Sequence, residues 1–248
     1  MSDWLFPAAV IIFAFVVAGF VKGVVGMGMP SIAMGLLGVV FAPVQAAVLI
    51  LVPNLVTNVW QAGAGPRLAM LCRRLWTMGV GIFAGIWLAS GVLTSGDTRW
   101  ASLGLGVLLA AYGCLGFLRA AWRFPRRHES WASPLVGLTT GLIAGATGLF
   151  VIPALPYIQS LELDKEELIQ GLALTFIVSA LALGSALLAG GAVTPGLAWG
   201  SLFALAPAAL GMFIGQKLRQ RISALVFRRA LLAAMIALGL YIAARAVS

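Results

Sequence analysis

Long apolar runs dominate the pattern along this chain, and short stretches with charge, proline or glycine separate them. A helix that crosses a membrane needs roughly 20 predominantly apolar residues. Eight stretches meet this requirement, approximately at residues 8–37, 44–63, 75–94, 99–119, 133–158, 167–190, 195–215 and 225–245. The alternating segments of about ten residues that are typical of a membrane β-barrel do not occur. The pattern therefore predicts an all-α membrane protein with about eight transmembrane helices.

The first stretch is too long for one straight helix, and Gly26, Gly28 and Pro30 interrupt it. Proline removes a backbone hydrogen bond, and such a break is tolerated at membrane depth where the freed groups face protein or a wet cavity. We therefore predict a broken helix here. In the fifth stretch, Gly137, Gly141 and Gly145 are spaced four apart, which is more typical of close packing between helices.

Composition supports lipid as the surrounding solvent. Of the 248 residues, 62% are hydrophobic and only 9% are charged, with a mean hydropathy of +1.06; a soluble domain carries about 25% charged residues. The net charge of +9 arises from basic residues in short loops. That distribution is typical of the cytoplasmic side of a membrane protein and disfavours a nucleic-acid partner.

The basic loops also predict an orientation. Arginines follow the second and fourth stretches, so this side should be cytoplasmic, and with eight spans both termini should lie there too. One loop conflicts with this prediction, because it would lie outside although it carries Lys217, Arg219, Arg221, Arg228 and Arg229. A re-entrant segment that does not cross the membrane, or two halves of opposite orientation, would remove the conflict.

Glycine spacing indicates an internal duplication. Gly19, Gly23 and Gly26 recur as Gly141, Gly145 and Gly148 at an offset of 122, and Gly81 and Gly85 recur as Gly211 and Gly215 at an offset of 130. These similarities predict two four-helix repeats, residues 1–125 and 126–248, in one membrane domain. Secondary transporters built from repeats bind their substrates near the midplane, where the repeats meet and helices are broken.

Lys22 is the one charged residue well inside a predicted span. A charge at that depth costs at least about 2.5 kcal/mol and is a functional hypothesis by default; the alternative is that the side chain reaches the nearby interface. Backbone N–H groups freed at a helix break attract negative charge. An ammonium beside such a break therefore favours an anion site, and the absence of acidic residues at similar depth disfavours a cation carrier.

The second stretch predicts a polar helix face, because Asn54, Thr57, Asn58 and Gln61 follow the spacing i, i+3, i+4 and i+7. Uncharged amides and hydroxyls can coordinate an oxyanion, and the alternative is hydrogen bonding between helices. The second half offers a weaker set of hydroxyls. The predicted substrate-binding residues are Lys22, Gly26, Gly28, Pro30, Asn54, Thr57, Asn58, Gln61, Thr147, Gly148, Thr175 and Ser179.

Metal, cofactor and catalytic chemistry find no support. Met27, Met29 and Met34 could suggest copper, but methionine in a helix more often serves packing. Cys72 and Cys114 are isolated in the sequence, so we predict no catalytic residue, no metal site and no cofactor. Nor does the chain contain a nucleotide-binding GxxxxGK[ST] run, which disfavours direct ATP coupling.

Two glycine-rich segments carry a resemblance to a known family. They read AGFVKGVVGMGMPSIAMG, followed by LVPNLVTNVWQ, and TGLIAGATGLFVIPALPY in the second half. Together they resemble the TauE/SafE sulfite exporter family of bacterial membrane proteins, over nearly the whole chain. Family members carry a richer glycine run where this chain has GMGMP.

The resemblance implies a multi-pass protein of the bacterial inner membrane that moves small sulfur-containing anions, such as sulfite or sulfoacetate, without ATP. Its expected partners are the anion and membrane lipid, and a homodimer is compatible with the sequence. We therefore expect a secondary transporter that exports small anions by alternating access, not an enzyme. The alternative is a non-transporting scaffold or assembly protein, in which the polar face would pack dry against a neighbouring helix.

Overall fold

The computed structural model describes residues 5–95, 98–117, 124–219, 221 and 223–247, which form helices and no strand. The all-α prediction is therefore confirmed. The long helices are α1 (Leu5–Val25), α3 (Pro43–Ala64), α4 (Leu68–Thr94), α5 (Thr98–Phe117), α6 (Glu129–Thr147), α8 (Lys165–Ala189), α9 (Pro195–Leu218) and α10 (Ala224–Val247). Two short helices, α2 (Met29–Leu37) and α7 (Ala154–Gln159), and a 3-10 turn at Arg126–His128 complete the described chain.

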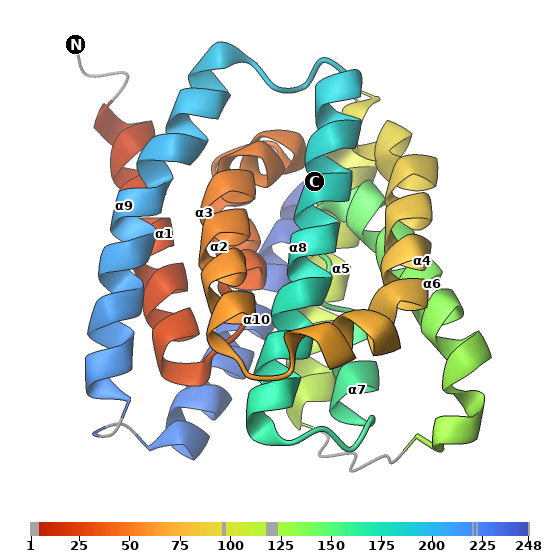
Figure 1. Ribbon diagram of the computed structural model, residues 1–248. Coiled ribbons are helices and arrows are strands. Elements are labelled where there is room, and N and C mark those ends of the chain that lie inside the picture. The colour runs from red at the N-terminus through yellow and green to blue at the C-terminus, as the bar shows by residue number, and fades with distance from the viewer. Residues whose placement is uncertain (1–4, 96–97, 118–123, 220, 222, 248) are drawn as a thin grey trace.

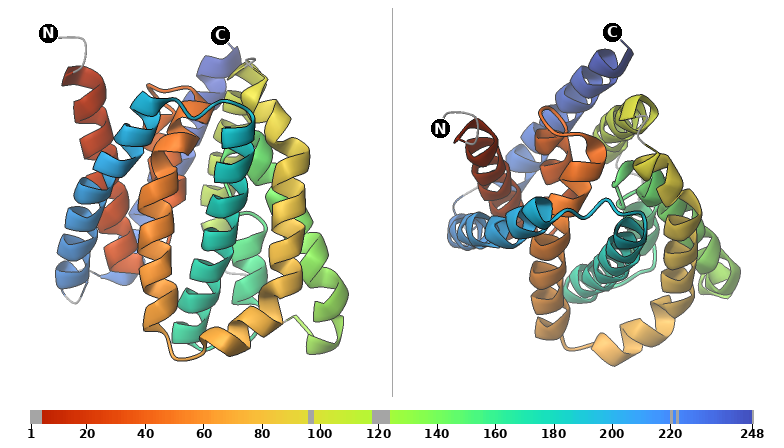
Figure 2. Two further views of the ribbon diagram at one scale, coloured as in Figure 1. Left: turned by 45° about the horizontal axis from the view of Figure 1, so that its top comes forward. Right: turned by 90° about the horizontal axis from the view of Figure 1, so that it is seen from above.

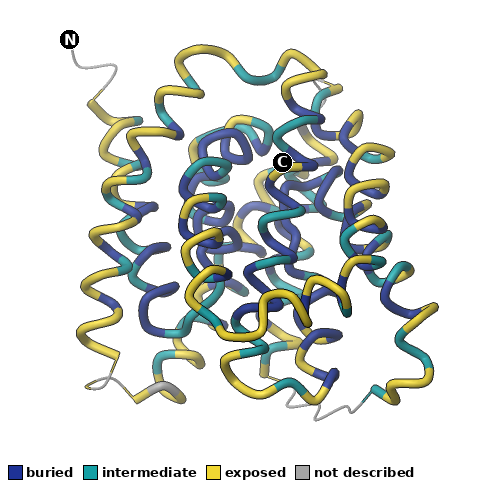
Figure 3. Tube along the Cα trace, in the orientation of Figure 1, coloured by how far each residue is buried: buried dark blue, intermediate teal, exposed yellow. Residues whose placement is uncertain are grey.

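Seven of the long helices are long and apolar enough to cross a membrane. The exception is α6, in which serine and threonine residues lower the hydropathy. Large apolar side chains such as Phe6, Trp76, Leu88 and Phe203 are exposed on the outside, whereas buried residues gather around α3 and α8 (Figure 3). An outer surface of this kind requires lipid as its solvent.

The predicted break in the first stretch is confirmed. α1 ends at Val25, and Gly26 and Gly28 have φ angles of 87° and 95°, in the left-handed region that glycine adopts without strain. Pro30 lies in the first turn of α2, where its missing N–H costs no hydrogen bond. However, the stretch 8–37 does not form one span as predicted, because α2 turns back beside α1 (Figure 1).

The fifth stretch, 133–158, also turns back. α6 ends at Thr147, and Gly148 follows with a φ of 74°. The chain then returns to α7, where the Tyr157 hydroxyl lies 2.6 Å from the hydroxyl of Ser133, near the start of α6. The prediction of a single span is therefore wrong here too, since a long helix and a short returning segment replace it.

The two reversals make the halves of the chain run in opposite directions. α1, α3 and α5 descend in Figure 1, whereas α6, α8 and α10 ascend, and both termini lie at the same end (Figure 2). The N-terminus thus lies opposite the connection between α3 and α4. The prediction that the termini share a side with this arginine-bearing connection is wrong, because it counted residues 8–37 as one crossing.

The end of the molecule opposite the termini, called the basic end below, carries most of the described basic residues. At this end, the Arg67 guanidinium lies 3.8 Å from the Glu167 carboxylate, and Arg228 donates to Gly116 O. The helix ends and connections that lie here (Figure 1) carry Arg67, Arg73, Arg74, Arg126, Arg127, Lys165, Lys217, Arg219, Arg221, Arg228 and Arg229. Arg99 lies at the other end, where it donates to Ala246 O. The conflict between the loops therefore disappears; Arg119 and Arg123 lie outside the described residues.

Glycine lines two of the helix interfaces, α1 against α9 and α4 against α6. Gly23 of α1 lies against the carbonyl of Met212, and Gly141 of α6 lies against the carbonyl of Ile82. A Cβ atom at either glycine would overlap the facing backbone. The two facing residues, Ile82 and Met212, are 130 residues apart, which is the offset that the sequence predicted for α4 and α9. The two glycines, Gly23 and Gly141, are only 118 residues apart.

This spacing differs from the predicted offset of 122, which aligns the breaks at Gly26 and Gly148. Measured from the interface glycines Gly23 and Gly141, the break of the second half comes four residues later. Four residues are about one helical turn. Relative to its glycine contacts, the first helix of the second half therefore breaks one turn later than the first helix of the first half.

Candidate functional site

Lys22 lies in the last turn of α1 and is directed toward α3 rather than toward the surface. Its side chain is buried, with 4% exposed. The Nζ atom donates to Thr57 Oγ1 at 3.1 Å and to Asn58 Oδ1 at 2.7 Å. Within the described part of the chain, no carboxylate forms an ion pair with it. The Lys22 nitrogen is therefore hydrogen-bonded to neutral oxygens, and within the described residues no countercharge is paired with it.

The predicted polar face of α3 forms a connected network. Asn58 Nδ2 donates to Asn54 Oδ1 at 2.6 Å, and Asn54 Nδ2 donates to Phe176 O of α8 at 3.4 Å. One turn further along α3, Gln61 Nε2 donates to Gly26 O at 2.6 Å and fixes the break. Hydrogen bonds thus run from α1 and its break through α3 to α8.

Ser201 of α9 explains how Pro53 is accommodated within α3. Proline lacks the N–H that would bond the carbonyl four residues earlier, and Leu49 O is the group left free. Ser201 Oγ donates to Leu49 O at 3.0 Å and accepts from the Val52 N–H at 3.1 Å. The sequence analysis missed Ser201, although Pro53 signalled that the freed carbonyl needs a partner.

The predicted residues of the second half divide into two groups. Thr175 and Ser179 are buried on α8, and the Asn54 contact with Phe176 places this part of α8 across from the network. Their hydroxyls donate to carbonyls of their own helix, at 2.9 Å each. Thr175 also lines a groove between α4 and α8, and neither hydroxyl has a described bond to Lys22 or α3.

Thr147 and Gly148 lie elsewhere, at the second break. A Cβ atom at Gly148 would lie 3.3 Å from Ala47 Cβ, near the start of α3. Lys22 contacts α3 at Thr57, ten residues later, or about 15 Å along the helix. The structure thus gathers Lys22, Gly26 and the polar face of α3 into one site and keeps the second break apart.

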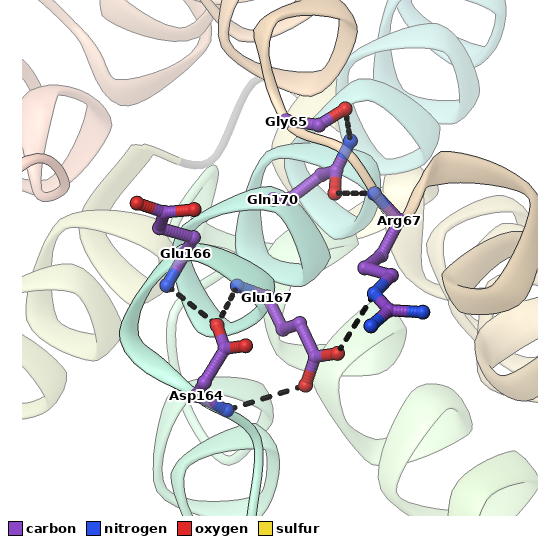
Figure 4. Close-up of polar contacts among 6 residues, drawn as sticks. All are labelled: Gly65, Arg67, Asp164, Glu166, Glu167 and Gln170. Atoms are coloured by element: carbon purple, nitrogen blue, oxygen red, sulfur yellow. Dashed lines mark hydrogen bonds and ion pairs between the residues drawn. The ribbon is translucent and has the colours of Figure 1, made fainter.

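A second polar cluster lies at the basic end (Figure 4). It is called the latch below and consists of Gln170, Arg67 and Glu167 with the carbonyls of Ala62 and Gly65. Gln170 of α8 is 1% exposed; its Nε2 donates to Ala62 O at 2.6 Å and to Gly65 O at 2.8 Å, and its Oε1 accepts from the Arg67 N–H at 3.1 Å. The ion pair between Arg67 and Glu167 adds a contact on the exposed side. The latch ties the connection between α3 and α4 to the first turns of α8.

Asp164 caps the end of α8 that carries the latch residues Glu167 and Gln170. Its carboxylate accepts from the N–H groups of Glu166 and Glu167, at 2.9 and 2.8 Å, and caps the helix. The Glu167 carboxylate accepts in turn from the Asp164 N–H at 3.2 Å. The cap thereby holds Glu167 at the end of α8 that faces Arg67.

The site is closed to solvent. Asn54 and Ser179 are fully buried, and Asn58 is 1% exposed. A groove with a cavity volume of about 410 Å³ opens between α4 and α8, but apolar residues, among them Trp76 and Val178, line most of it. Among the described residues, no group of three or more His, Cys, Asp or Glu side chains could hold a metal ion.

Comparisons with known proteins give one match. Residues 11–242 match the family described as Sulfite exporter TauE/SafE. No curated protein and no solved structure matches the chain. The match covers nearly the whole chain and includes every residue of the network around Lys22.

Proposed function

Because the chain belongs to the TauE/SafE sulfite exporter family, we propose that it is a secondary transporter that exports sulfite or an organosulfonate such as sulfoacetate across the bacterial inner membrane. The single observation that carries the proposal is the buried ammonium of Lys22 without a countercharge. A buried charge is strongly unfavourable unless it is paired. A small anion would supply the missing charge when it binds.

Lys22 can donate to the anion directly. An ammonium has three N–H groups, and Thr57 and Asn58 accept from two of them. The third is left for the substrate. In this proposal Gly26, Gly28 and Pro30 open the backbone beside the anion. Asn54 and Gln61 hold the surrounding helices in place. Thr175 and Ser179 contribute hydroxyl groups from α8. Thr147 and Gly148 serve as the moving break of the second half.

Alternating access would arise from the two halves, residues 1–125 and 126–248, acting as inverted repeats. Inverted repeats allow a transporter to exchange its outward and inward states by rocking one unit against the other around a fixed site. Two features support this proposal: the halves run in opposite directions, and the α1 to α9 interface has a counterpart between α6 and α4. Passage of the anion at the basic end would require the latch to open.

The test is anion exchange by purified protein in liposomes. Wild-type protein should exchange labelled sulfite or sulfoacetate across the membrane. Lys22→Ala should reduce the rate at least about tenfold, since it removes a hydrogen bond to a charged group, worth about 1.5–3 kcal/mol. Arg126→Ala, which removes an exposed charge at the basic end, serves as the control and should retain nearly full activity.

Two outcomes would contradict the proposal. If folded wild-type protein exchanges no anion of a broad panel, the chain is not an anion transporter, and the scaffold interpretation gains ground. If Lys22→Ala and Arg126→Ala slow exchange equally, Lys22 does not belong to the site. Size-exclusion profiles of both variants check that they fold.

A further inference from the structure

Ser31, which the sequence analysis did not select, carries a buried hydroxyl without a partner. Its side chain is fully buried, and its Oγ atom makes no hydrogen bond. Thr140 in α6 is the other buried side-chain polar atom of this kind in the described ranges. A buried hydroxyl without a partner costs free energy and calls for an explanation.

Ser31 lies in the first turn of α2, where backbone donors are also free. The first bond of this helix runs from the Ile32 N–H to Gly28 O, at 3.2 Å. The N–H groups of Met29 and Ser31 have no acceptor among the described residues, and Pro30 has no N–H. Side chains in a helix lean toward its N-terminus. The Ser31 hydroxyl and the two amides thus belong to one helical turn after the break, and none of them has an acceptor among the described residues.

This donor set follows the Lys22 turn of α1 closely along the chain. Only residues 26–28 separate α1 from α2, and the step from Val25 to Met29 can span at most about 14 Å. The Gly26 N–H donates to Lys22 O at 2.7 Å, and Gln61 holds the Gly26 carbonyl. The charge without a counterion and the donors without acceptors therefore occupy two sides of the same short break.

We propose that Ser31 is a ligand of the transported anion and that it selects for oxyanions. In the loaded state, the Ser31 hydroxyl and the N–H groups of Met29 and Ser31 donate to oxygens of the anion, while Lys22 balances its charge. Directional donors of this kind suit sulfite or a sulfonate group, which offers several acceptor oxygens, better than a halide. This inference rests on the proposed function and adds the residue that recognises oxygen.

The experiment compares two variants that each remove a buried hydroxyl without a partner, Ser31→Ala and, as the matched control, Thr140→Val. Binding of sodium sulfite and of sodium chloride to the purified protein is measured by titration calorimetry. Thermal unfolding is measured without added anion. Ser31→Ala should raise the Kd for sulfite at least about tenfold, or about 1.4 kcal/mol, and change chloride binding much less. Thr140→Val should leave the Kd for sulfite within about twofold of the wild type.

Thermal unfolding separates a ligand role from a packing role. Without anion, Ser31→Ala should unfold at the same temperature as the wild type or higher, because it removes an unpaired buried hydroxyl. Weaker sulfite binding in an equally stable protein is not expected of a residue that only packs. Should Ser31→Ala fail to fold, Ser31→Cys keeps the size, is a much weaker donor and should raise the Kd in the same way.

The failures are distinguishable. A folded Ser31→Ala or Ser31→Cys variant that binds sulfite like the wild type overturns the role of Ser31 and leaves the proposed function intact. Equal losses in Ser31→Ala and Thr140→Val, or equal losses for sulfite and chloride, also overturn it. Wild-type protein that binds neither sulfite nor sulfoacetate overturns the proposed function and this inference with it.

Discussion

Lys22 and Asn58 lie on different helices and meet at 2.7 Å, with an amide oxygen as the acceptor where a carboxylate would form a salt bridge. An amide accepts from Lys22 but adds no negative charge, so a protonated Lys22 has no internal counterion. A carboxylate at the same position would compensate that charge permanently. Whether residue 58 is Asn or Asp therefore decides whether Lys22 needs a bound anion as its counterion.

This reasoning predicts that Asn58→Asp abolishes anion binding. The new carboxylate would pair with Lys22 and act as an internal counterion in place of sulfite, so sulfite binding should weaken at least about tenfold, because ion-pair partners contribute a few kcal/mol when buried. Titration calorimetry with sulfite measures this. The unfolding temperature without anion should not fall. Lys22→Met is the comparison, because it also abolishes binding but leaves no charged pair.

The opposite result would contradict the role of Lys22. If Asn58→Asp binds sulfite as tightly as the wild type, the ammonium does not provide the attraction. A variant that unfolds at a much lower temperature would show that the aspartate remains unpaired, and the geometry around Lys22 would need revision.

Single polar residues were the hardest to predict from the sequence. The spacing of Asn54, Thr57 and Asn58 revealed a polar helix face, and the structure confirms that they share one network. Ser31 and Gln170 were missed. Each is one polar residue without a periodic pattern, and its importance depends on burial and on partners far along the chain.

At the level of the helices, glycine performs two different tasks. Gly26, Gly28 and Gly148 adopt positive φ angles and reverse the chain, whereas Gly85 and Gly141 bring two backbones into contact. The sequence predicted a break near Gly26 and close packing near Gly141, but it could not distinguish a kink from a reversal. That difference depends on the sign of φ at two residues, which the amino-acid type permits but does not determine.

Close packing can be tested within one helix, since α4 contains one glycine in contact with a neighbouring backbone and one with open space beside it. A Cβ atom at Gly85 would overlap Leu138 O of α6, whereas at Gly91 there is nothing within 4 Å. Gly85→Ala should therefore destabilise the protein by about 1–3 kcal/mol through overpacking. Gly91→Ala should be neutral or stabilising by up to about 1 kcal/mol, because alanine favours the helix.

Thermal unfolding in one detergent provides the comparison. A lower unfolding temperature for Gly85→Ala together with an unchanged or higher one for Gly91→Ala is expected. If both variants behave alike, the backbones of α4 and α6 are not in the tight contact described above, and the counterpart relation to α1 and α9 loses its support.

For the whole molecule, the two reversals account for the distribution of charge. The charged loops indicated contradictory orientations because residues 8–37 and 133–158 were each counted as one crossing. With each stretch folded back, the basic loops meet at one end, and Arg99 and Arg245 belong to the other. An error in two short segments thus inverted the predicted topology of half the chain, although most helix boundaries were close.

The gathered charge makes a sharp prediction about orientation. Lysine and arginine are enriched on the cytoplasmic side of membrane proteins, so the basic end should face the cytoplasm and both termini the periplasm. Thr194→Cys probes the connection between α8 and α9, at the end with the termini, and Lys165→Cys probes the basic end; both residues are exposed. The native Cys72 and Cys114 are first replaced by serine, because both are exposed too. In intact cells, a membrane-impermeant maleimide should label the cysteine at 194 and leave the one at 165 unlabelled until the membrane is opened. Labelling at 165 alone would place the basic end outside. The exported anion would then leave past the latch, rather than enter there.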